Sequence, residues 1–404
     1  MGRTAKDNRD LPHPKPVEKI ELSDRNATGR FIAAALFLLV GAGALVYAFR
    51  QLGTPEAGWQ AIQAGTGSGP TCGEEFVFLY ELGAGGQPVL TESRAVTAEY
   101  TKACRKAFQM FHTSETFEDT VSLCEISGRP NQELEVDPAL YGAFAAVREE
   151  GDRTVYLGPV YARYGDLFYC TDDSQLADFD PYSSEEVARE YAAAAAYAMD
   201  PAHIDVELLG ENRVRLRVSE EYLAFAQREG IERFLDFGWM RNAFAADYLA
   251  QTMAEAGFTK GSISSIDGFI RCLDGREGSY SLNLYDVEGE KPVQAGVLEY
   301  QGPMSLVSLR AFPLNEGDRQ RCYRLRNGEL RTMYLDPRDG RCKNALNALT
   351  CYAGDRTCAQ LAMAAAPIFI ADTFETGPLE RLAEEGVYAA CFRNGALWRT
   401  EPQP

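Results

Sequence analysis

Hydrophobic and polar residues follow one another in patterns that predict folded structure from about Cys72 onward. The run EEFVFLYEL (74–82) has the aromatic and β-branched content of a buried strand. Apolar residues then recur at helical spacing between 93 and 111, which predicts a helix with one buried face. That face is formed by Val96, Tyr100, Cys104, Ala107, Phe108 and Phe111. Similar periodicity, with capping residues at the N-terminal ends, predicts helices over 137–150, 184–199, 242–256 and 357–366.

Shorter patterns predict a sheet with several antiparallel hairpins. IDVELL and RVRLRV flank the turn 210–212, an arrangement typical of a β-hairpin. Further strands are predicted at 261–272, 280–285, 296–300, 306–312, 320–326, 330–334, 387–392 and 396–400. Because helices and hairpins are mixed along the chain, the fold class that we predict is α+β.

A long apolar run precedes this region. Phe31–Phe49 contains no charged residue and is bracketed by Arg30 and Arg50. At about 1.5 Å per residue, the run is just long enough to cross a hydrocarbon layer of about 30 Å. Basic residues before it favour a cytoplasmic N-terminus. We therefore predict a single-pass protein of the cell membrane, with a cytoplasmic tail (1–30), a transmembrane helix (31–49), a linker (50–70) and an extracytoplasmic domain (71–401).

A cleaved signal peptide is the alternative interpretation of the apolar run. The run is longer than a usual signal core, and no Ala-x-Ala site directly follows it. All ten cysteines lie beyond it, between Cys72 and Cys391. An even number of cysteines on the exported side favours structural disulfides, whose pairing stays open.

The region beyond the apolar run is strongly acidic. The chain has a formal charge of −19, and the +2 of residues 1–30 leaves −21 for the rest. Such a domain repels nucleic acid and anionic lipid, so nucleic-acid binding is excluded. Familiar catalytic motifs are absent too, since the sequence contains no G-x-S-x-G, H-E-x-x-H or P-loop. His112 and His203 are the only histidines beyond the tail, which argues against a triad with an imidazole base.

Four longer stretches, taken in their order along the chain, are more specific than the patterns described so far. They are DFGWMRNAFAAD (236–247), GFTKGSISSIDGFI (257–270), MYLDPRDG (333–340) and ALTCYAGDRTCAQLAMAAA (348–366). Three shorter motifs precede them, CGEEFVFLYELG, VDPALYGAF and YLGPV (156–160). From about Cys72 to Arg399 this order resembles the FAD:protein FMN transferases, the ApbE-type flavin transferases. The resemblance implies their fold, a flavin nucleotide (FAD or FMN) as ligand and an exported protein as partner.

The first stretch resembles the family's turn Asp-x-Gly-Gly-x-Ala-Lys-Gly-(aromatic)-Ala-x-Asp. The matching positions are Asp236, Gly238, Phe244, Ala245 and Asp247, and the differing ones are Trp239, Arg241, Asn242 and Ala243. Asn242 takes the place of the lysine, and Arg241 offers a replacement charge beside it. Together with the third stretch, the resemblance implies cofactor-binding residues at Asp236, Gly238, Arg241, Asp247, Asp336 and Arg338.

Two further departures fall where the family binds magnesium, and two fall at other positions of its motifs. Gln360 and Ala364 stand at the metal-binding Asp and Thr, Met333 stands at a histidine, and Asp267 replaces a glycine. Pyrophosphate cleavage needs a hard cation held by oxygen ligands, and Ala364 offers none. The resemblance therefore implies FAD as ligand but leaves magnesium without two of its ligands.

These residues are compatible with three different functions. The first is an exported flavin-transferase-like domain without magnesium-dependent FMN transfer, acting as a flavin-binding or scaffolding module. The second is an active variant enzyme, in which new metal oxygens come from Asp267, Asp336, Asp339 or Asp355. The third is a cell-envelope interaction protein that binds no flavin, with Trp239 filling the former pocket.

Overall fold

The computed structural model describes residues 55–65, 67, 69–84, 86–273, 279–314, 318, 321–393 and 395–400. The chain divides into two units, Met1–Pro55 and Glu56–Pro404, and the second is the one described below. No helix within the described ranges is long and apolar enough to cross a membrane. The predicted transmembrane helix, Phe31–Phe49, lies outside those ranges.

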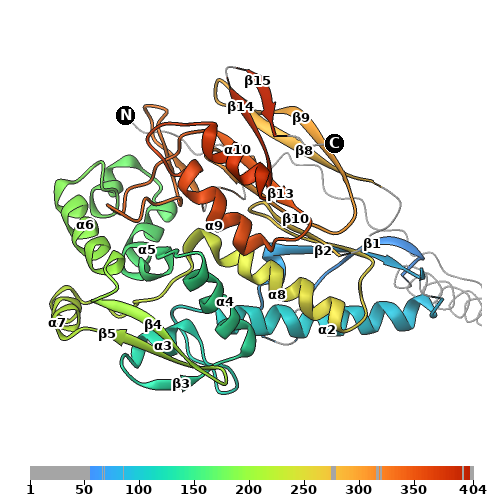
Figure 1. Cartoon of the computed structure of the whole chain (residues 1–404), viewed down its shortest axis with the longest axis horizontal. Helices are drawn as coiled ribbons and strands as arrows, with labels where there is room; N and C mark the ends of the chain where they lie inside the picture. Colours follow the sequence, from blue (N-terminus) through green and yellow to red (C-terminus); the bar gives the residue numbers. More distant parts are fainter. Residues whose placement is uncertain are drawn as a thin grey trace, which may run out of the picture. The chain divides into compact units, whose positions relative to one another are not determined.

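An eight-stranded sheet forms the centre of the second unit (Figure 1). In spatial order its strands are β1 (Gly58–Ile62), β2 (Phe76–Leu82), β6 (Gly261–Ser265), β7 (Phe269–Cys272), β10 (Met304–Arg310), β13 (Ala348–Ala353), β14 (Tyr388–Arg393) and β15 (Ala396–Arg399). Every pair of neighbours in this sheet is antiparallel. The sheet therefore agrees with an α+β class, because parallel crossovers do not build it.

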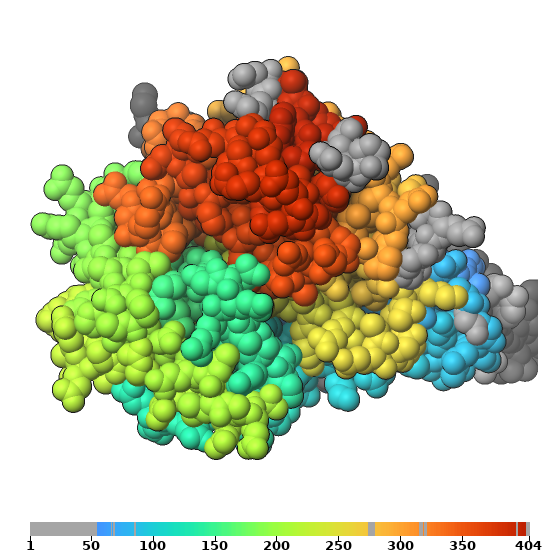
Figure 2. All heavy atoms as spheres, viewed as in Figure 1, coloured from blue at the N-terminus to red at the C-terminus, as the bar shows by residue number. Residues whose placement is uncertain are grey.

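Helices cover one face of the sheet. They are α2 (Val89–Met110), α8 (Arg241–Glu255), α9 (Cys358–Phe369) and α10 (Gly377–Glu384). Alternate residues of the central strands, such as Val307 and Leu349, enter the main hydrophobic core beneath them. Figure 2 shows the C-terminal part of the chain, in red, packed directly over α8, in yellow. The turn that precedes α8 is thereby enclosed between helices and sheet.

A long hairpin packs on the opposite face. It consists of β8 (Ser279–Glu288) and β9 (Lys291–Gln301). Its inward residues, including Leu284 and Leu298, form a second cluster with Leu306 and Tyr352 of the sheet. The central strands are buried on both faces as a result, which explains why β13 has six buried residues in succession.

The remaining elements form a smaller layer beyond the helices. Its helices are α3 (Leu123–Gly128), α4 (Pro138–Glu149), α5 (Gly158–Tyr164), α6 (Glu185–Met199) and α7 (Glu220–Glu229). Its strands are β3 (Glu133–Glu135), β5 (Arg213–Val218) and β4 (Ile204–Gly210), with a separate pair β11 (Cys322–Arg324) and β12 (Leu330–Thr332). Short 3₁₀ turns include η2 (Gly73–Glu75), η3 (Thr154–Tyr156), η4 (Gly165–Tyr169), η5 (Asp173–Asp178) and η6 (Gly238–Met240).

Most predicted elements occur near their expected bounds, and the differences have local causes. The predicted strand 261–272 is two strands, because Gly268 turns the chain with φ +104°. The predicted linker contains β1, whose Ile62 packs into the core. Helices α3, α5, α7 and α10 had no predicted counterpart. In α7 the signal was present, since Ser219 caps the helix and Gly230 ends it in the left-handed conformation.

The expectation of structural disulfides is not supported, because no disulfide joins cysteines within the described ranges. Most of these thiols instead occupy buried apolar positions, as Cys351 does in the core. Cys358 donates a hydrogen bond to the carbonyl of Ile270 at 3.3 Å. Cysteine behaves as a small hydrophobic residue in such surroundings, so the even count was misleading.

Candidate functional site

The turn before α8 is closed by its own residues. The Asp236 carboxylate accepts a hydrogen bond from the backbone N–H of Gly238 at 2.8 Å. Gly238 has φ +54°, and a Cβ there would lie 2.4 Å from the ring of Tyr161. Glycine is therefore required twice, by the backbone conformation and by the ring packed against it. Burial raises the pKa of Asp236, while the N–H of Gly238 and nearby arginines oppose that effect.

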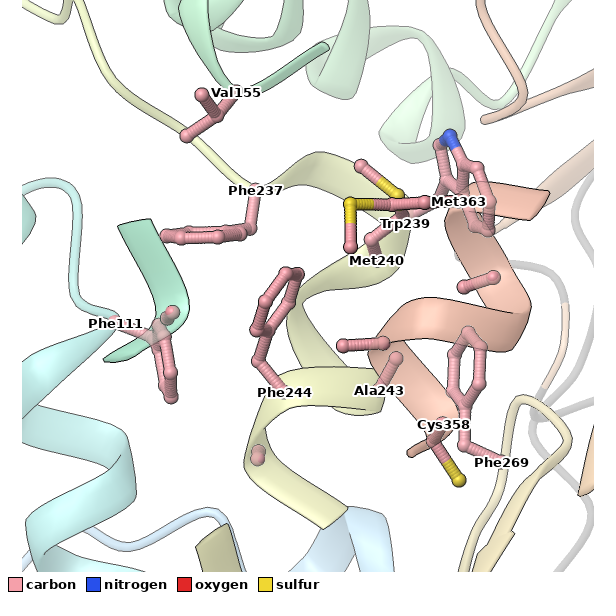
Figure 3. Packing of buried hydrophobic residues seen from close by; sticks show 14 of the residues in the cluster. Phe111, Val155, Phe237, Trp239, Met240, Ala243, Phe244, Phe269, Cys358 and Met363 are labelled. Carbon is pink, nitrogen blue, oxygen red and sulfur yellow. The ribbon is translucent and has the colours of Figure 1, made fainter. Parts of the chain in front are cut away.

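The two aromatic residues of this turn leave it on opposite sides (Figure 3). Phe237 lies 4.5 Å from Phe244 and 5.3 Å from Phe111, measured between ring centres. Trp239 points toward α9 and lies 5.2 Å from the ring of Tyr334. Only 2% of Trp239 is exposed, so it is a core residue that also forms a wall of the site.

A network of charged and amide side chains lies at the start of α8. The Arg241 guanidinium contacts the Glu75 carboxylate at 2.5 and 2.7 Å. Asn242 donates to Glu75 at 2.9 Å and to Asp267 at 3.0 Å. Arg321 lies 3.1 Å from Asp267 and 3.6 Å from Glu75. The network therefore joins the starts of β2 and α8, the β6–β7 turn and the residue that precedes β11.

A cavity of about 440 Å³ opens beside this network. Its polar lining includes Glu75, Asp236, Arg241, Asp267 and Arg321. Its aromatic lining is Phe108, Phe111, Tyr161, Tyr164, Phe168, Tyr169 and Trp239. Pockets for small ligands commonly range from about 300 to 1,000 Å³ and combine apolar walls with a few polar groups. This cavity has both properties.

His112 lines the same cavity as a neutral base rather than a cation. Its Nδ1 accepts hydrogen bonds from the backbone N–H groups of Ser114, at 3.2 Å, and Glu115, at 2.9 Å. Burial lowers its pKa, partly opposed by the Glu115 charge. Arg233 completes this side, contacting Asp236 at 3.4 Å and the Ser114 hydroxyl at 2.8 Å.

Asp247 does not line this cavity, and its contacts hold two helices together. Its two carboxylate oxygens accept hydrogen bonds from the backbone N–H groups of Cys358 and Ala359, each at 2.9 Å. Arg271 lies 3.4 Å away. Burial raises the pKa of Asp247, with Arg271 and the two N–H groups opposing it. This residue ties α8 to the N-terminus of α9, where a carboxylate also complements the helix dipole.

Asp336 and Arg338 belong to a third place, a tight turn. The Asp336 carboxylate accepts hydrogen bonds from Arg338, at 2.6 Å, and from Lys343, at 2.8 Å. Burial would raise the pKa of Asp336, but these hydrogen bonds outweigh burial and lower it to about 2. Gly340, with φ +68°, closes the turn against Tyr191 of α6. Neither Asp336 nor Arg338 lines the 440 Å³ cavity.

The positions that carry magnesium in the flavin transferases do not fit a metal ion here. The Gln360 side chain accepts from the backbone N–H of Thr357 at 3.0 Å, in a capping box that begins α9. Ala364, one helical turn later, has no donor atom. No three His, Cys, Asp or Glu side chains in the described part of the chain are grouped to hold a metal. The chemistry of this donor set disagrees with magnesium.

The alternative metal oxygens do not converge either. Asp267 belongs to the Asn242–Arg321 network, whereas Asp336 and Asp339 both contact Lys343. Asp355 is exposed on the loop before α9. Only Asp336 and Asp339 share surroundings, and the cation between them is the Lys343 ammonium, so the four carboxylates form no common metal site.

The six predicted cofactor-binding residues thus separate into three groups, of which only Asp236, Gly238 and Arg241 line the cavity. The lining residues that were not predicted include Glu75, Tyr161 and Arg321. Tyr161 directly follows the motif YLGPV, and Glu75 lies inside CGEEFVFLYELG. These two motifs could therefore have indicated both residues as candidates for the cavity lining. Arg321 lies in no recognisable motif, and only the fold places it in the network.

Comparisons with known proteins show the fold. No family model and no curated relative matches the chain. The ApbE protein of Thermotoga maritima has a similar structure, with a TM-score of 0.58, 12% identity, and coverage of 85% of this chain and 97% of that one. The flavin transferase ApbE of Vibrio cholerae aligns with a TM-score of 0.56 at 14% identity, covering 85% and 97%.

A third similar structure is the flavinyl transferase ApbE of Pseudomonas stutzeri in its apo form. Its TM-score is 0.53 at 15% identity, and the alignment covers 85% of this chain and 94% of that one. The second unit therefore has the fold of the ApbE flavin transferases, as the order of the sequence motifs predicted.

Proposed function

We propose that this chain is a flavin-transferase-like domain that binds a flavin in the 440 Å³ cavity and does not carry out magnesium-dependent FMN transfer. One observation carries the proposal: separate stretches that resemble the flavin transferases meet at this cavity. Cys72 and Glu75 come from CGEEFVFLYELG, Asp236 and Arg241 from DFGWMRNAFAAD, and Met333 from MYLDPRDG. Sequence motifs that resembled the family only by chance would not be expected to line the same cavity.

The missing metal ligands support the loss of transfer chemistry. Cleaving a pyrophosphate spreads negative charge that a cation must neutralise. Gln360 is engaged in the α9 cap, and Ala364 has no oxygen to offer. The remaining geometry supports holding a flavin, through aromatic walls and a fixed polar network. A scaffold with a completely filled pocket is less well supported, because Trp239 leaves the cavity open beside it.

The test uses the full-length chain, purified in a mild detergent, with FAD, FMN and riboflavin. We expect at least one flavin to bind saturably, with an affinity that magnesium changes by less than about twofold. We also expect chromatography to detect no AMP after incubation with FAD and magnesium. Magnesium-dependent release of FMN and AMP would instead establish an active variant enzyme.

A cavity-blocking variant makes this binding test specific. Ala162 is an exposed residue of α5 that lines the cavity, so Ala162→Trp is expected to weaken flavin binding at least about tenfold by occupying the space. Ala396→Trp, at an exposed alanine of β15, is the matched control and should bind flavin normally. Equal binding by both variants would place the flavin elsewhere.

We also propose that Phe31–Phe49 anchors this domain to the cell membrane, with residues 71–401 on the outer side. The uncharged run and the basic residues before it support this arrangement. In intact cells, an external protease should remove the domain, whereas a tag at the N-terminus should stay protected. Release of the whole chain by alkaline washing of membranes would contradict the anchor.

A further inference from the structure

The 440 Å³ cavity has an unusual charge balance for a nucleotide site. Its ionisable lining consists of the carboxylates of Glu75, Asp166, Asp236 and Asp267 and the guanidiniums of Arg233, Arg241 and Arg321. With a neutral His112, the described lining therefore carries one more negative than positive charge. A phosphate entering such a cavity meets net repulsion rather than attraction.

Each arginine is also already paired. Arg241 contacts Glu75 at 2.5 Å, Arg321 contacts Asp267 at 3.1 Å, and Arg233 contacts Asp236 at 3.4 Å. Within the described lining, no guanidinium is left without a carboxylate. A phosphate would have to share one of these guanidiniums with its carboxylate, whose negative charge would stay beside it in the cavity.

The helix end that could bind a phosphate is likewise compensated. Helix N-termini attract anions through their exposed N–H groups and the helix dipole. Here the side chains of Arg241 and Asn242, the first two residues of α8, hold the carboxylates of Glu75 and Asp267. These two carboxylates already place negative charge at that end of the helix.

The cavity walls favour a planar ring instead. Seven aromatic side chains line it, and one of them, Tyr169, is 72% exposed. Trp239, Asp267, Arg321 and Met333 also form a wall shared with a smaller void of about 30 Å³. In this wall Trp239 Nε1 and Asp267 Oδ1 are buried without a hydrogen-bond partner among the described residues, whereas Arg321 Nη1 lies 3.1 Å from the other carboxylate oxygen of Asp267.

The Trp239 N–H and Asp267 Oδ1 match, by type, groups on the polar edge of a flavin ring. That edge presents one N–H donor between two carbonyl acceptors, and the wall offers one acceptor, Asp267 Oδ1, and one donor, Trp239 Nε1. These atoms are buried in the structure, so a side-chain rotation must accompany binding. Met333 lines both voids and has the flexibility for this movement.

From the charge balance and the aromatic walls, we infer that the cavity selects a flavin without phosphate, riboflavin, over FMN and FAD. This inference rests on the proposed function, because it assumes that a flavin binds here. The ligand class is a neutral, planar heteroaromatic ring, and the discriminating feature is the phosphate charge. A phosphate monoester carries about −1.5 to −2 at neutral pH.

The experiment compares riboflavin, FMN and FAD by isothermal titration with the full-length chain at low and high ionic strength. At low salt, riboflavin is expected to bind at least about tenfold more tightly than either phosphorylated flavin. The difference should shrink as salt rises, because salt screens the repulsion. An adenosine control without phosphate should bind more weakly than riboflavin if the flavin edge is recognised.

A charge variant with a close control tests the cause. Glu75→Gln leaves Arg241 and Arg321 with one fewer negative partner, so it should strengthen FMN binding relative to riboflavin at least about threefold. Glu74→Gln removes the same charge from the neighbouring exposed residue and should leave the ratio unchanged. Circular dichroism and thermal melting establish that both variants are folded.

The outcomes separate the two proposals. Tighter binding of riboflavin with a ratio that falls in Glu75→Gln supports the selection. FMN or FAD binding as tightly as riboflavin overturns the selection but leaves the flavin-binding function standing. Absence of binding by all three flavins overturns both. If Glu75→Gln does not fold, the wild-type ratio and its salt dependence still decide.

Discussion

Gly238→Ala is expected to lower the free energy of unfolding by about 3 kcal/mol, the larger part of which comes from one contact. A Cβ at this position would lie 2.4 to 2.7 Å from the ring atoms of Tyr161. That ring is only 8% exposed and has little room to move. The positive φ of +54° adds a separate backbone cost of about 1 kcal/mol. Urea unfolding followed by circular dichroism measures the total.

Gly257→Ala is the matched control for the Gly238 prediction. Gly257 has a positive φ of +85°, but a Cβ there would meet no atom within 4 Å. The control should therefore lose only about 1 kcal/mol, from the backbone conformation alone. Adding Gly238→Ala to a Tyr161→Ala background should also lose only about that amount. Equal losses in Gly238→Ala and Gly257→Ala would show that the Tyr161 ring moves aside without cost.

Asp247→Ala is expected to destabilise the chain by about 3 kcal/mol. The change removes the acceptor for the N–H groups of Cys358 and Ala359 and leaves Arg271 with one fewer anionic partner. Because these groups join α8 to α9, the loss acts on the core beneath both helices. Thermal melting and urea unfolding of wild type and variant measure the effect.

A second carboxylate near α9 provides the comparison. Asp355→Ala removes an exposed negative charge shortly before the same helix, and its effect should stay within about 0.5 kcal/mol. Asp247→Asn keeps one carbonyl acceptor and should fall between the two. A wild-type stability for Asp247→Ala would mean that water replaces the carboxylate, and Asp247 would then be available for another role.

The sequence motifs predicted part of the candidate site. Asp236 and Gly238 were recognised through the family's turn, and both are at the cavity. Asp247 belongs to the same turn motif but caps α9 through Cys358 and Ala359. The motif fixed the spacing of these residues along the turn and α8, whereas the packing of α9 decided which of them meets another helix.

Local pattern determined most of the elements of this protein. The periodicity in α2 placed Val96, Tyr100 and Cys104 in the core, and capping residues marked the starts of α4 and α6, where Asp137 and Ser184 accept the capping hydrogen bonds. These features depend on neighbours within one or two turns, so they can be read from a single sequence. The order of the motifs also indicated the flavin-transferase fold.

The tertiary structure alone decided how the charges are matched. Glu75, Arg241, Asp267 and Arg321 are distant in sequence, yet the fold brings them into one network. It also separated Asp336 from the cavity and left most of the cysteines as buried thiols, with no disulfide among the described residues. Such pairings depend on chain segments packed from opposite ends of the domain, and no local pattern records which segments will meet.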